Sequence, residues 1–156
     1  MMEITIPGYG TLNLTCLVLD FNGTLACDGK MINGTKPLLN ILSEELQIHV
    51  LTADTFGDAA AELSGTTCNT VIISPDDQDI AKLRYIEKIG PETTVCIGNG
   101  RNDHLMLKKA ALGIAVIQEE GTATETIAAA DIVTTSILDA LNLLSHPLRL
   151  IATLRS

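Results

Sequence analysis

Short apolar runs rich in β-branched residues alternate along this chain with stretches whose apolar residues have helical spacing. Runs that are apolar at every position predict strands buried on both faces, as in parallel sheets. Helical stretches between them predict right-handed crossovers that cover both faces. The sequence therefore predicts an α/β fold, a three-layer sandwich around a doubly wound, mostly parallel sheet. The predicted strands of this sheet are 12–19, 48–51, 70–73, 94–97, 114–117 and 132–134. The predicted helices are 35–46, 56–63, 79–89, 102–111, 123–130 and 137–154, the last with a break near Pro147.

The N-terminal segment predicts a β-hairpin that leads into the sheet. Strand-like segments at 2–6 and 12–19 flank the turn-forming string Pro7-Gly8-Tyr9-Gly10. The second segment leads directly into Asp20, and a glycine-containing loop over 21–34 follows it. This places Asp20 at the end of a buried strand.

The composition is that of one globular domain with an acidic surface. A length of 156 residues predicts a single domain over 1–156, and 46% hydrophobic residues are sufficient for a packed core. The formal net charge is −9 and no cluster of lysines or arginines occurs, which argues against nucleic acids and anionic membranes as partners. No apolar run approaches the ~18 residues of a membrane span.

Cysteine spacing and the N-terminus together favour a cytoplasmic protein. None of the four cysteines forms a C-x-x-C pair, so a zinc site is not expected. Cys16 and Cys96 stand in apolar runs and are expected to be reduced core thiols. The first residues contain neither the basic stretch nor the long apolar stretch of a secretion signal.

Polar residues follow the apolar strands at the points where the strands end. The carboxyl ends of parallel strands meet at one edge of the sheet, and ligands bind there. Several such residues from different strands therefore predict a site, whereas one alone predicts only a loop. These residues are Asp20, Asn22, Thr24, Thr52, Asp54, Ser74, Asp76, Asp77, Asn99, Asn102 and Asp103, with Lys82 in the helix after strand 70–73.

Asp20 is the residue that points most directly to chemistry. A carboxylate at the end of a buried strand is held rigidly, so that it can attack phosphorus and form an aspartyl phosphate. Its second oxygen and the backbone carbonyl of Asn22 are hard ligands that suit Mg²⁺, and Gly23 lets the chain turn tightly. The alternative is that Asp20 is a turn or helix-cap residue, which the D-x-N-G-T string alone leaves open.

Four segments together resemble the motifs of the haloacid dehalogenase superfamily. Asp20-Phe21-Asn22-Gly23-Thr24 is similar to its first motif, D-x-D/T-G-T, and Val50-Leu51-Thr52 to its second, an apolar strand ending in threonine. Lys82 is similar to the lysine of the third motif, and Gly98-Asn99-Gly100-Arg101-Asn102-Asp103 to the fourth, G-D-G-x-N-D. The order and spacing make the resemblance specific. It implies a HAD-like Rossmannoid fold and a HAD-like hydrolase that acts as a phosphatase.

Within that superfamily the chain looks most like the phosphorylation domain of P-type ATPases. Thr52-Ala53-Asp54 resembles their T-G-D string, and 102–115, Gly121-Thr122 and 128–133 resemble the stretch after their fourth motif. Only 31 residues separate Asp20 from Thr52, which leaves no room for the nucleotide-binding domain of the pumps, and no membrane helices are predicted. The resemblance therefore implies a soluble phosphatase-like domain and excludes ion pumping.

The resemblance implies a role for each matching residue. Thr52 would bind the phosphoryl oxygens, and Lys82 would stabilise charge on the nucleophile Asp20 and the phosphoryl group. The cofactor would be Mg²⁺, which screens the repulsion between an anionic nucleophile and an anionic phosphate. The expected catalytic residues are Asp20, Asn22, Thr52 and Lys82, the expected metal ligands are Asp20, Asn22, Asn99 and Asp103, and the expected substrate-binding residues are Gly23, Thr24 and Ala53.

Two positions depart from the superfamily pattern. Asn22 stands where phosphatases have an acid/base aspartate, and an amide cannot exchange a proton near neutral pH. Asn99 stands where a metal-binding aspartate is usual, and its neutral oxygen predicts weaker metal binding. The sequence therefore predicts a slow phosphatase, or one with a long-lived aspartyl phosphate. Asp54, Asp76 and Asp77 remain open as the missing base, with a turn or cap carboxylate as the alternative for each.

Three functions remain open at this point. The first is a Mg²⁺-dependent phosphohydrolase without a cap domain, since neither usual insertion point has room for one. Its open site would admit a large phosphorylated substrate or be closed by a neighbouring subunit of a homo-oligomer, as in a tetrameric sugar-acid phosphate phosphatase of the superfamily. The second is a catalytically weak regulator or phospho-ligand-binding protein, which the two amides favour. The third is an α/β structural domain without activity.

Overall fold

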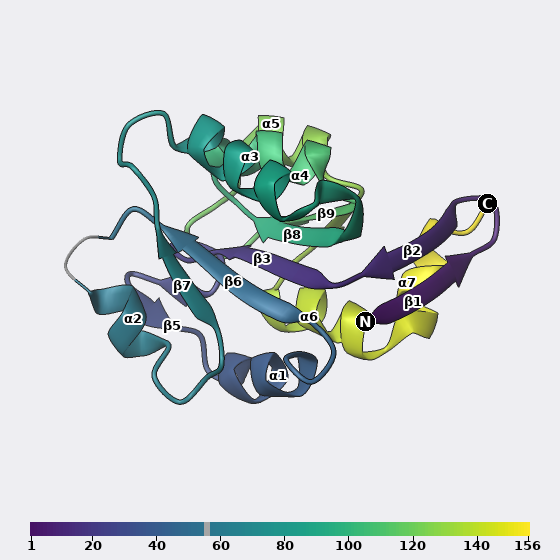
Figure 1. Ribbon diagram of the computed structural model, residues 1–156, viewed down its shortest axis with the longest axis horizontal. Helices are drawn as coiled ribbons and strands as arrows, with labels where there is room; N and C mark the ends of the chain where they lie inside the picture. Colours follow the sequence, from purple (N-terminus) through teal and green to yellow (C-terminus); the bar gives the residue numbers. More distant parts are fainter. Residues whose placement is uncertain (55–56) are drawn as a thin grey trace.

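The computed structural model describes residues 1–54 and 57–156, and its centre is a six-stranded sheet. The strands are β3 (Cys16–Asp20), β6 (Gln47–Thr52), β7 (Asn69–Ile72), β8 (Thr94–Gly98), β9 (Leu112–Val116) and β10 (Ile132–Thr134). Their order is β10-β9-β8-β3-β6-β7, and every neighbouring pair is parallel (Figure 1). The predicted α/β fold with a doubly wound, mostly parallel sheet is therefore confirmed.

Helices cover both faces of the sheet and complete the three layers (Figure 1). One face carries α1 (Thr35–Leu42) and α6 (Ile137–Ser145). The other face carries α3 (Gln78–Ile89), α4 (His104–Lys109) and α5 (Thr124–Ala129). In the part of the chain that the structure describes, no helix is both long and apolar enough to cross a bilayer. The remaining helical segments are α2 (Asp58–Glu62), α7 (Pro147–Leu154) and the short 3₁₀ turns η1 (Pro91–Thr93) and η2 (Arg101–Asp103).

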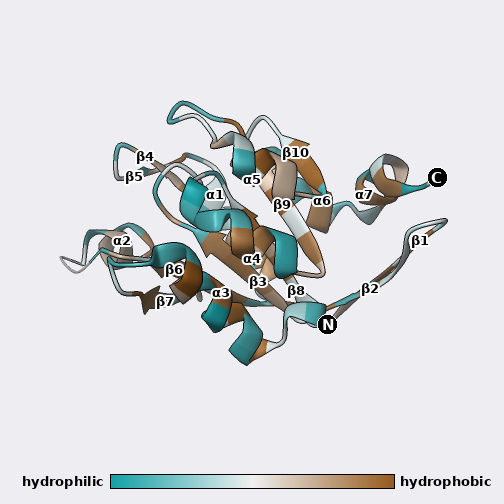
Figure 2. Cartoon of the chain, turned by 90° about the horizontal axis from the view of Figure 1, so that it is seen from above, coloured by the Kyte–Doolittle hydropathy of each residue, from teal (hydrophilic) through white to brown (hydrophobic). Residues whose placement is uncertain are grey.

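Side chains along the central strand β3 alternate between two apolar cores. Leu17 and Leu19 pack in the core on the α1 and α6 side, whereas Val18 packs in the core on the α3 and α4 side. All three are fully buried, and each contributes roughly 1.5–3 kcal/mol relative to an exposed side chain. The central strands are mostly brown in the hydropathy colouring of Figure 2. This packing on both faces holds Asp20, the last residue of β3, in a fixed position.

The predicted N-terminal hairpin is confirmed, and it lies at the opposite end of β3 from Asp20 (Figure 1). β1 (Met2–Ile6) pairs antiparallel with β2 (Gly10–Leu14), and α7 packs against β1. One predicted boundary is wrong, because the strand expected over 12–19 is divided at Thr15. The residues before Thr15 pair with β1, while those after it pair with β6 and β8. One extended segment therefore serves two sheets.

A second, smaller hairpin lies in the segment predicted as a loop over 21–34. β4 (Ala26–Cys27) pairs with β5 (Lys30–Met31) around Asp28-Gly29, where both residues have positive φ. The Asp-Gly dipeptide is a hairpin turn signal, but strands of two residues are too short to show an alternating pattern. The sequence therefore did not predict this hairpin.

Two predicted helices have different boundaries in the structure. The helix expected over 35–46 ends at Leu42, after which the chain turns into β6. The helix expected over 102–111 begins as the 3₁₀ turn η2 and ends at Lys109. Phe56, the predicted start of α2, lies outside the described residues.

Candidate active site

Asp20 ends the central strand at the edge of the sheet where the chain connections diverge. β6 lies on one side of β3, and β8 lies on the other after the chain has crossed over from β7. Such a switch point leaves a crevice at the carboxyl ends of the strands. The Asp20 side chain is only 10% exposed there, so that it is held rigidly and largely shielded from water.

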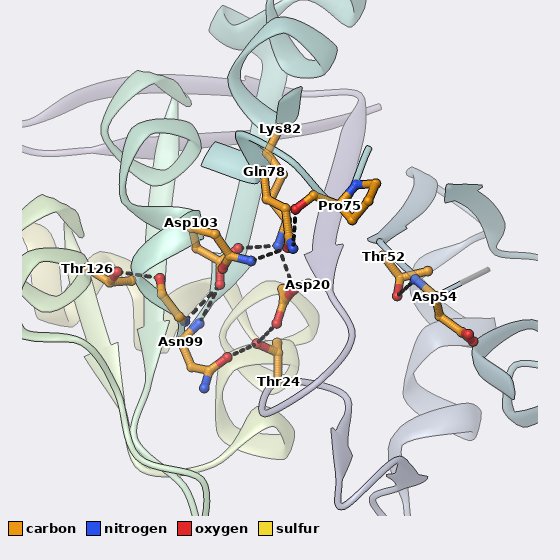
Figure 3. A network of polar contacts seen from close by, with 12 residues as sticks. Asp20, Thr24, Thr52, Asp54, Pro75, Gln78, Lys82, Asn99, Asp103 and Thr126 are labelled. Carbon is orange, nitrogen blue, oxygen red and sulfur yellow. Dashed lines mark hydrogen bonds and ion pairs between the residues drawn. The ribbon is translucent and has the colours of Figure 1, made fainter. Parts of the chain in front are cut away.

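Lys82 binds two carboxylates at once (Figure 3). Its Nζ lies 2.6 Å from Asp20 Oδ1 and 2.6 Å from Asp103 Oδ1. Lys82 comes from α3 and Asp103 from η2, so three segments distant in the sequence meet at this point. All three residues are buried. Because two carboxylates share one ammonium group, the cluster keeps one net negative charge that favours the binding of a further cation.

Burial and a neighbouring carboxylate raise the pKa of Asp20. Desolvation is the largest cause and the charge of Asp103 the second, and together they outweigh Lys82 and Thr24 and bring the pKa from 3.8 to about 6. Burial opposes the charge on Lys82, but the two carboxylates hold the pKa of Lys82 above its usual value. Asp20 is therefore mostly ionised at neutral pH and Lys82 stays charged, which are the charge states that their predicted roles require.

Backbone amides fix the position of Asp103. Its Oδ2 accepts hydrogen bonds from the N–H groups of Asn99 at 3.0 Å and Gly100 at 2.9 Å. These bonds draw the segment into the 3₁₀ turn η2, which explains why the helix predicted over 102–111 starts later. A side chain at Gly98 would place its Cβ 2.5 Å from Asp103 Cγ, so the site requires glycine there.

Thr24 connects the predicted nucleophile to Asn99. Its fully buried hydroxyl lies 3.2 Å from Asp20 Oδ2 and 3.1 Å from Asn99 Oδ1, and its one proton can be donated to either oxygen (Figure 3). Asn99 Nδ2 donates to the carbonyl of Gly121 at 3.0 Å. This bond fixes the amide so that its oxygen faces the Thr24 hydroxyl.

Asn22 and Gly23 form the turn that follows β3. Gly23 has φ of +82°, and its N–H donates to the carbonyl of Ala26 at 2.8 Å. A Cβ on Gly23 would collide with the Asn99 amide. Gly23 is therefore buried between Asp20 and Asn99, whereas Asn22 is exposed.

A cavity of about 390 Å³ adjoins these residues. Its size is within the range of small-molecule sites, which is enough for a phosphoryl group and part of the molecule that carries it. Gly23 and Thr24 lie behind Asp20 and are not part of its lining. The lining residues are Asp20, Asn22, Thr52, Ala53, Asp54, Gln78, Lys82 and Asn102.

Thr52 ends β6 and lies on the opposite side of the cavity from the Lys82 cluster (Figure 3). Its Oγ1 accepts a hydrogen bond from the Asp54 N–H at 3.1 Å. Because Oγ1 is the acceptor in that bond, its own proton can be donated to an oxygen atom in the cavity. Asp54 Oδ2 accepts a hydrogen bond from the Ala59 N–H at 2.7 Å, which orients the Asp54 carboxylate.

The third strand end contributes less to the cavity than the sequence predicts. Ser74, Asp76 and Asp77 are exposed and do not line the cavity. Ser74 Oγ accepts a hydrogen bond from the Asp76 N–H at 3.2 Å, as in a turn. Of the three carboxylates considered as the missing base, Asp54 is the one that the structure brings to the cavity.

Two glutamines that the sequence did not single out support the site. Gln78, the first residue of α3, lines the cavity, and its Oε1 accepts a hydrogen bond from Asn102 Nδ2 at 2.7 Å. Gln118, in the loop after β9, donates through Nε2 to the carbonyls of Gly23 and Thr24. Neither belongs to a motif, so only their places after a strand or at a helix start could have indicated them.

The oxygen atoms around Asp20 suit a hard divalent cation. Asp20 and Asp103 supply two carboxylates and Asn99 an amide oxygen, and Mg²⁺ is usually bound through one or two carboxylates together with water. Among residues 1–54 and 57–156, no group of three or more His, Cys, Asp and Glu side chains could hold a metal, so a cation here would also need amide, carbonyl or water oxygens as ligands. The donor set and its net negative charge therefore fit Mg²⁺.

Comparison with known sequences matches part of this chain to a hydrolase family. The sequence pattern of the haloacid dehalogenase-like hydrolase family matches residues 77–139, which include Lys82, Asn99 and Asp103. An uncharacterized protein of Methanocaldococcus jannaschii is 48% identical over 82 residues, which are 50% of this chain and 88% of that protein.

Solved structures similar to this chain include two sugar-acid phosphate phosphatases. The 3-deoxy-D-manno-octulosonate 8-phosphate phosphatase of Moraxella catarrhalis, in complex with magnesium, phosphate and KDO, is 20% identical with a TM-score of 0.63, and the match covers 92% of this chain and 94% of that chain. The cobalt-bound deoxy-D-mannose-octulosonate 8-phosphate phosphatase of Haemophilus influenzae is 14% identical with a TM-score of 0.68, over 85% of this chain and 87% of that chain. At these identities the similarity shows a shared fold.

Proposed function

We propose that this chain, whose residues 77–139 match the haloacid dehalogenase-like hydrolase family, is a hydrolase of that superfamily that cleaves phosphate esters with Asp20 as the nucleophile. The observation that carries this proposal is the Asp20 carboxylate at the end of β3, with Oδ1 bound by Lys82 and Oδ2 beside Thr24, at the wall of a cavity. A carboxylate oriented on both sides attacks from a fixed direction, which favours nucleophilic displacement.

The residues around the cavity have distinct tasks in this proposal. Asp20 attacks the phosphorus atom, and the bond between phosphorus and the leaving oxygen breaks as the aspartyl phosphate forms. Lys82 stabilises the negative charge as it moves from Asp20 to the phosphoryl oxygens. Thr52 donates its hydroxyl proton to a phosphoryl oxygen, and Ala53 contacts the substrate from the same wall. The buried Gly23–Thr24 turn supports Asp20 from behind.

We propose Mg²⁺ as the cofactor. Its ligands would be Asp20, the backbone carbonyl of Asn22, Asn99 and Asp103. A divalent cation at this place offsets the negative charge that the nucleophile and an anionic phosphate share. The magnesium named for the similar Moraxella catarrhalis structure supports this choice.

The second half of the reaction, hydrolysis of the aspartyl phosphate, is slow in this proposal. The Asn22 amide lines the cavity but cannot take a proton from the attacking water. Asp54 lines the same cavity and is the remaining candidate base. If hydrolysis is slow enough, the protein acts instead as a regulator or a phospho-ligand-binding protein, and Asn22 is the observation that favours this second function.

The substrate in this proposal is a phosphorylated molecule that reaches an open cavity. Within the described residues, the β4–β5 hairpin and α1 are the elements between β3 and β6, which supports the proposal of a site without a cap domain. We propose that a large substrate or a second copy of the chain in a homo-oligomer closes the site. The names of the similar structures make a phosphorylated sugar acid the first substrate class to test.

Hydrolysis of p-nitrophenyl phosphate with Mg²⁺ tests the proposal. Asp20→Asn keeps the size of the side chain but removes the nucleophile, so we expect kcat to fall at least about 10³-fold. Asp76→Asn is the matched control, because it removes an exposed carboxylate outside the cavity, and we expect wild-type kcat. Equal activity in wild type and Asp20→Asn would contradict the proposal. Mg²⁺ binding without turnover of any phosphate ester would favour the second function.

A further inference from the structure

The loop between β9 and α5, residues 117–123, supports the site from outside the cavity. Gly121 accepts the hydrogen bond from the Asn99 amide, and the Ala123 N–H donates to the Asn99 carbonyl at 2.9 Å. Gln118 lies in the same loop and contacts the other half of the site. The loop therefore bonds both to the segment after β8 and to the turn after the nucleophile.

Gln118 makes three hydrogen bonds with its amide. Its Nε2 donates to the carbonyl of Gly23 at 3.1 Å and to the carbonyl of Thr24 at 3.0 Å, so that each N–H has its own acceptor. Its Oε1 accepts a hydrogen bond from the Ile137 N–H, the first amide of α6, at 2.7 Å. A rotated amide would face two carbonyls with its oxygen and an N–H with its nitrogen, so these partners fix its orientation.

We propose that Gln118 is a positioning residue that sets the orientation of the Asp20 carboxylate. By holding both carbonyls of the Gly23–Thr24 turn, it fixes the backbone from which the Thr24 hydroxyl reaches Asp20 Oδ2. Lys82 holds the other oxygen of Asp20. The direction of the nucleophile is therefore set from one side by Lys82 and from the other by a chain of contacts that begins at Gln118. This inference rests on the proposed function of Asp20.

Two substitutions separate this role from the capping of α6. Gln118→Glu keeps an oxygen for the Ile137 N–H and adds a charge that helix N-termini favour, but its second oxygen repels the carbonyls of Gly23 and Thr24. Gln118→Met has similar volume, adds no charge and makes none of these hydrogen bonds. The control is Ser136→Ala, which removes the Ser136 Oγ cap of the Asp139 N–H at the same helix start without touching the turn.

Steady-state kinetics with p-nitrophenyl phosphate then test the role. Gln118 does not line the cavity, so we expect KM to stay within about threefold while kcat falls roughly 10–100-fold in both Gln118 variants, as for a misplaced reacting group. Ser136→Ala should keep kcat within about twofold, because it acts on α6 alone. Wild-type kcat in Gln118→Glu would overturn the proposal, since it would show that Gln118 serves only to cap α6.

Amide hydrogen exchange gives a second readout that needs no activity. The Leu25 and Ala26 N–H groups bond to the Phe21 carbonyl inside the turn, and we expect their exchange to be at least about tenfold faster in both Gln118 variants but unchanged in Ser136→Ala. If wild type shows no activity that depends on Asp20, the proposed function fails while the exchange still tests the support of the turn. Unchanged exchange in Gln118→Met would overturn the inference in either case.

Discussion

Asp20 is a residue whose buried charge lowers the folding stability of the metal-free protein. Its pKa of about 6 lies above the ordinary 3.8, so the folded protein holds the proton more tightly than the unfolded chain does. The ionisation of Asp20 therefore costs no stability below about pH 4, and its full cost is present above about pH 6. A charge kept at such a cost is expected for a functional residue rather than a structural one.

Removing this charge should make the metal-free protein more stable. In Asp20→Asn the pair between Lys82 and Asp103 remains, and the repulsion between the two carboxylates is gone. We expect the free energy of unfolding in urea, with EDTA at about pH 7.5, to rise by roughly 1–3 kcal/mol. The gain should disappear below about pH 4, where Asp20 is protonated in both states.

Asp103→Asn is the control for that experiment. Asp103 Oδ2 accepts two backbone hydrogen bonds and Oδ1 binds Lys82. An amide has only one acceptor oxygen, so the substituted side chain can accept either from the backbone N–H groups or from Lys82, but not from both. We therefore expect Asp103→Asn to be less stable than wild type under the same conditions. A loss of stability in Asp20→Asn would contradict the account of a destabilising buried carboxylate.

Gly23 tests how tightly the turn behind Asp20 is packed. Gly23→Ala adds a strained positive φ and a collision with the Asn99 amide, so we expect kcat to fall at least about tenfold and the free energy of unfolding to drop by roughly 2–4 kcal/mol. Gly29→Ala has a similar φ of +76° with no atom within 4 Å, so it measures the backbone strain alone. Equal effects of the two substitutions would show that the contact with Asn99 is unimportant.

Asn22 tests which half of the reaction limits turnover. Asn22→Asp supplies a carboxylate at the cavity that can take a proton from the attacking water, so we expect kcat to rise roughly 10–100-fold. Asn22→Ala is the control, because it removes the amide without adding a base, and it should not raise kcat. An unchanged kcat in Asn22→Asp would mean that hydrolysis of the aspartyl phosphate is not limited by a missing base.

At the scale of secondary-structure elements, the sequence predicts strands better than short hairpins. β3, β6 and β8 were predictable because continuous apolar runs are buried on both faces. The division at Thr15 was missed because both halves of the segment are extended, although Leu12-Asn13-Leu14-Thr15 alternates apolar and polar residues while Cys16–Leu19 is continuously apolar. The β4–β5 hairpin was missed because its strands have two residues each.

The packing of α7 against the N-terminal hairpin can be tested separately from the site. Leu150 is fully buried in the core that contains Ile4 and Ile6, so Leu150→Ala should lower the free energy of unfolding by about 2–5 kcal/mol. Leu148 is 80% exposed on the same helix, and Leu148→Ala should change the free energy of unfolding by less than about 0.5 kcal/mol. Urea unfolding measures both, and similar losses would contradict the packing of α7 described here.

At the scale of the whole molecule, the sheet topology explains which part of the site the sequence reveals. Asp20, Thr52, Lys82 and Asp103 follow apolar strands or occupy motif positions, so strand ends and motifs together predicted their meeting. The hydrogen bonds from Gln118 to the turn after Asp20 were not predictable. Gln118 follows β9, and the sequence alone does not show that β9 lies two strands away from β3 in the sheet. The position of the Gly23–Thr24 turn behind Asp20 was not predictable either, because it depends on packing against Asn99, which the spacing of residues in the sequence does not show.

The central claim is that Asp20 becomes phosphorylated, and chemical trapping tests it most directly. Wild-type protein is incubated with Mg²⁺ and p-nitrophenyl phosphate, quenched in acid and reduced with borohydride, which converts an aspartyl phosphate to homoserine. Peptide mass spectrometry should then find homoserine at position 20 in wild type, in higher yield than in Asn22→Asp, and none in Asp20→Asn or in EDTA. Hydrolysis by wild type without modification at Asp20, or with modification at another carboxylate, would contradict the account.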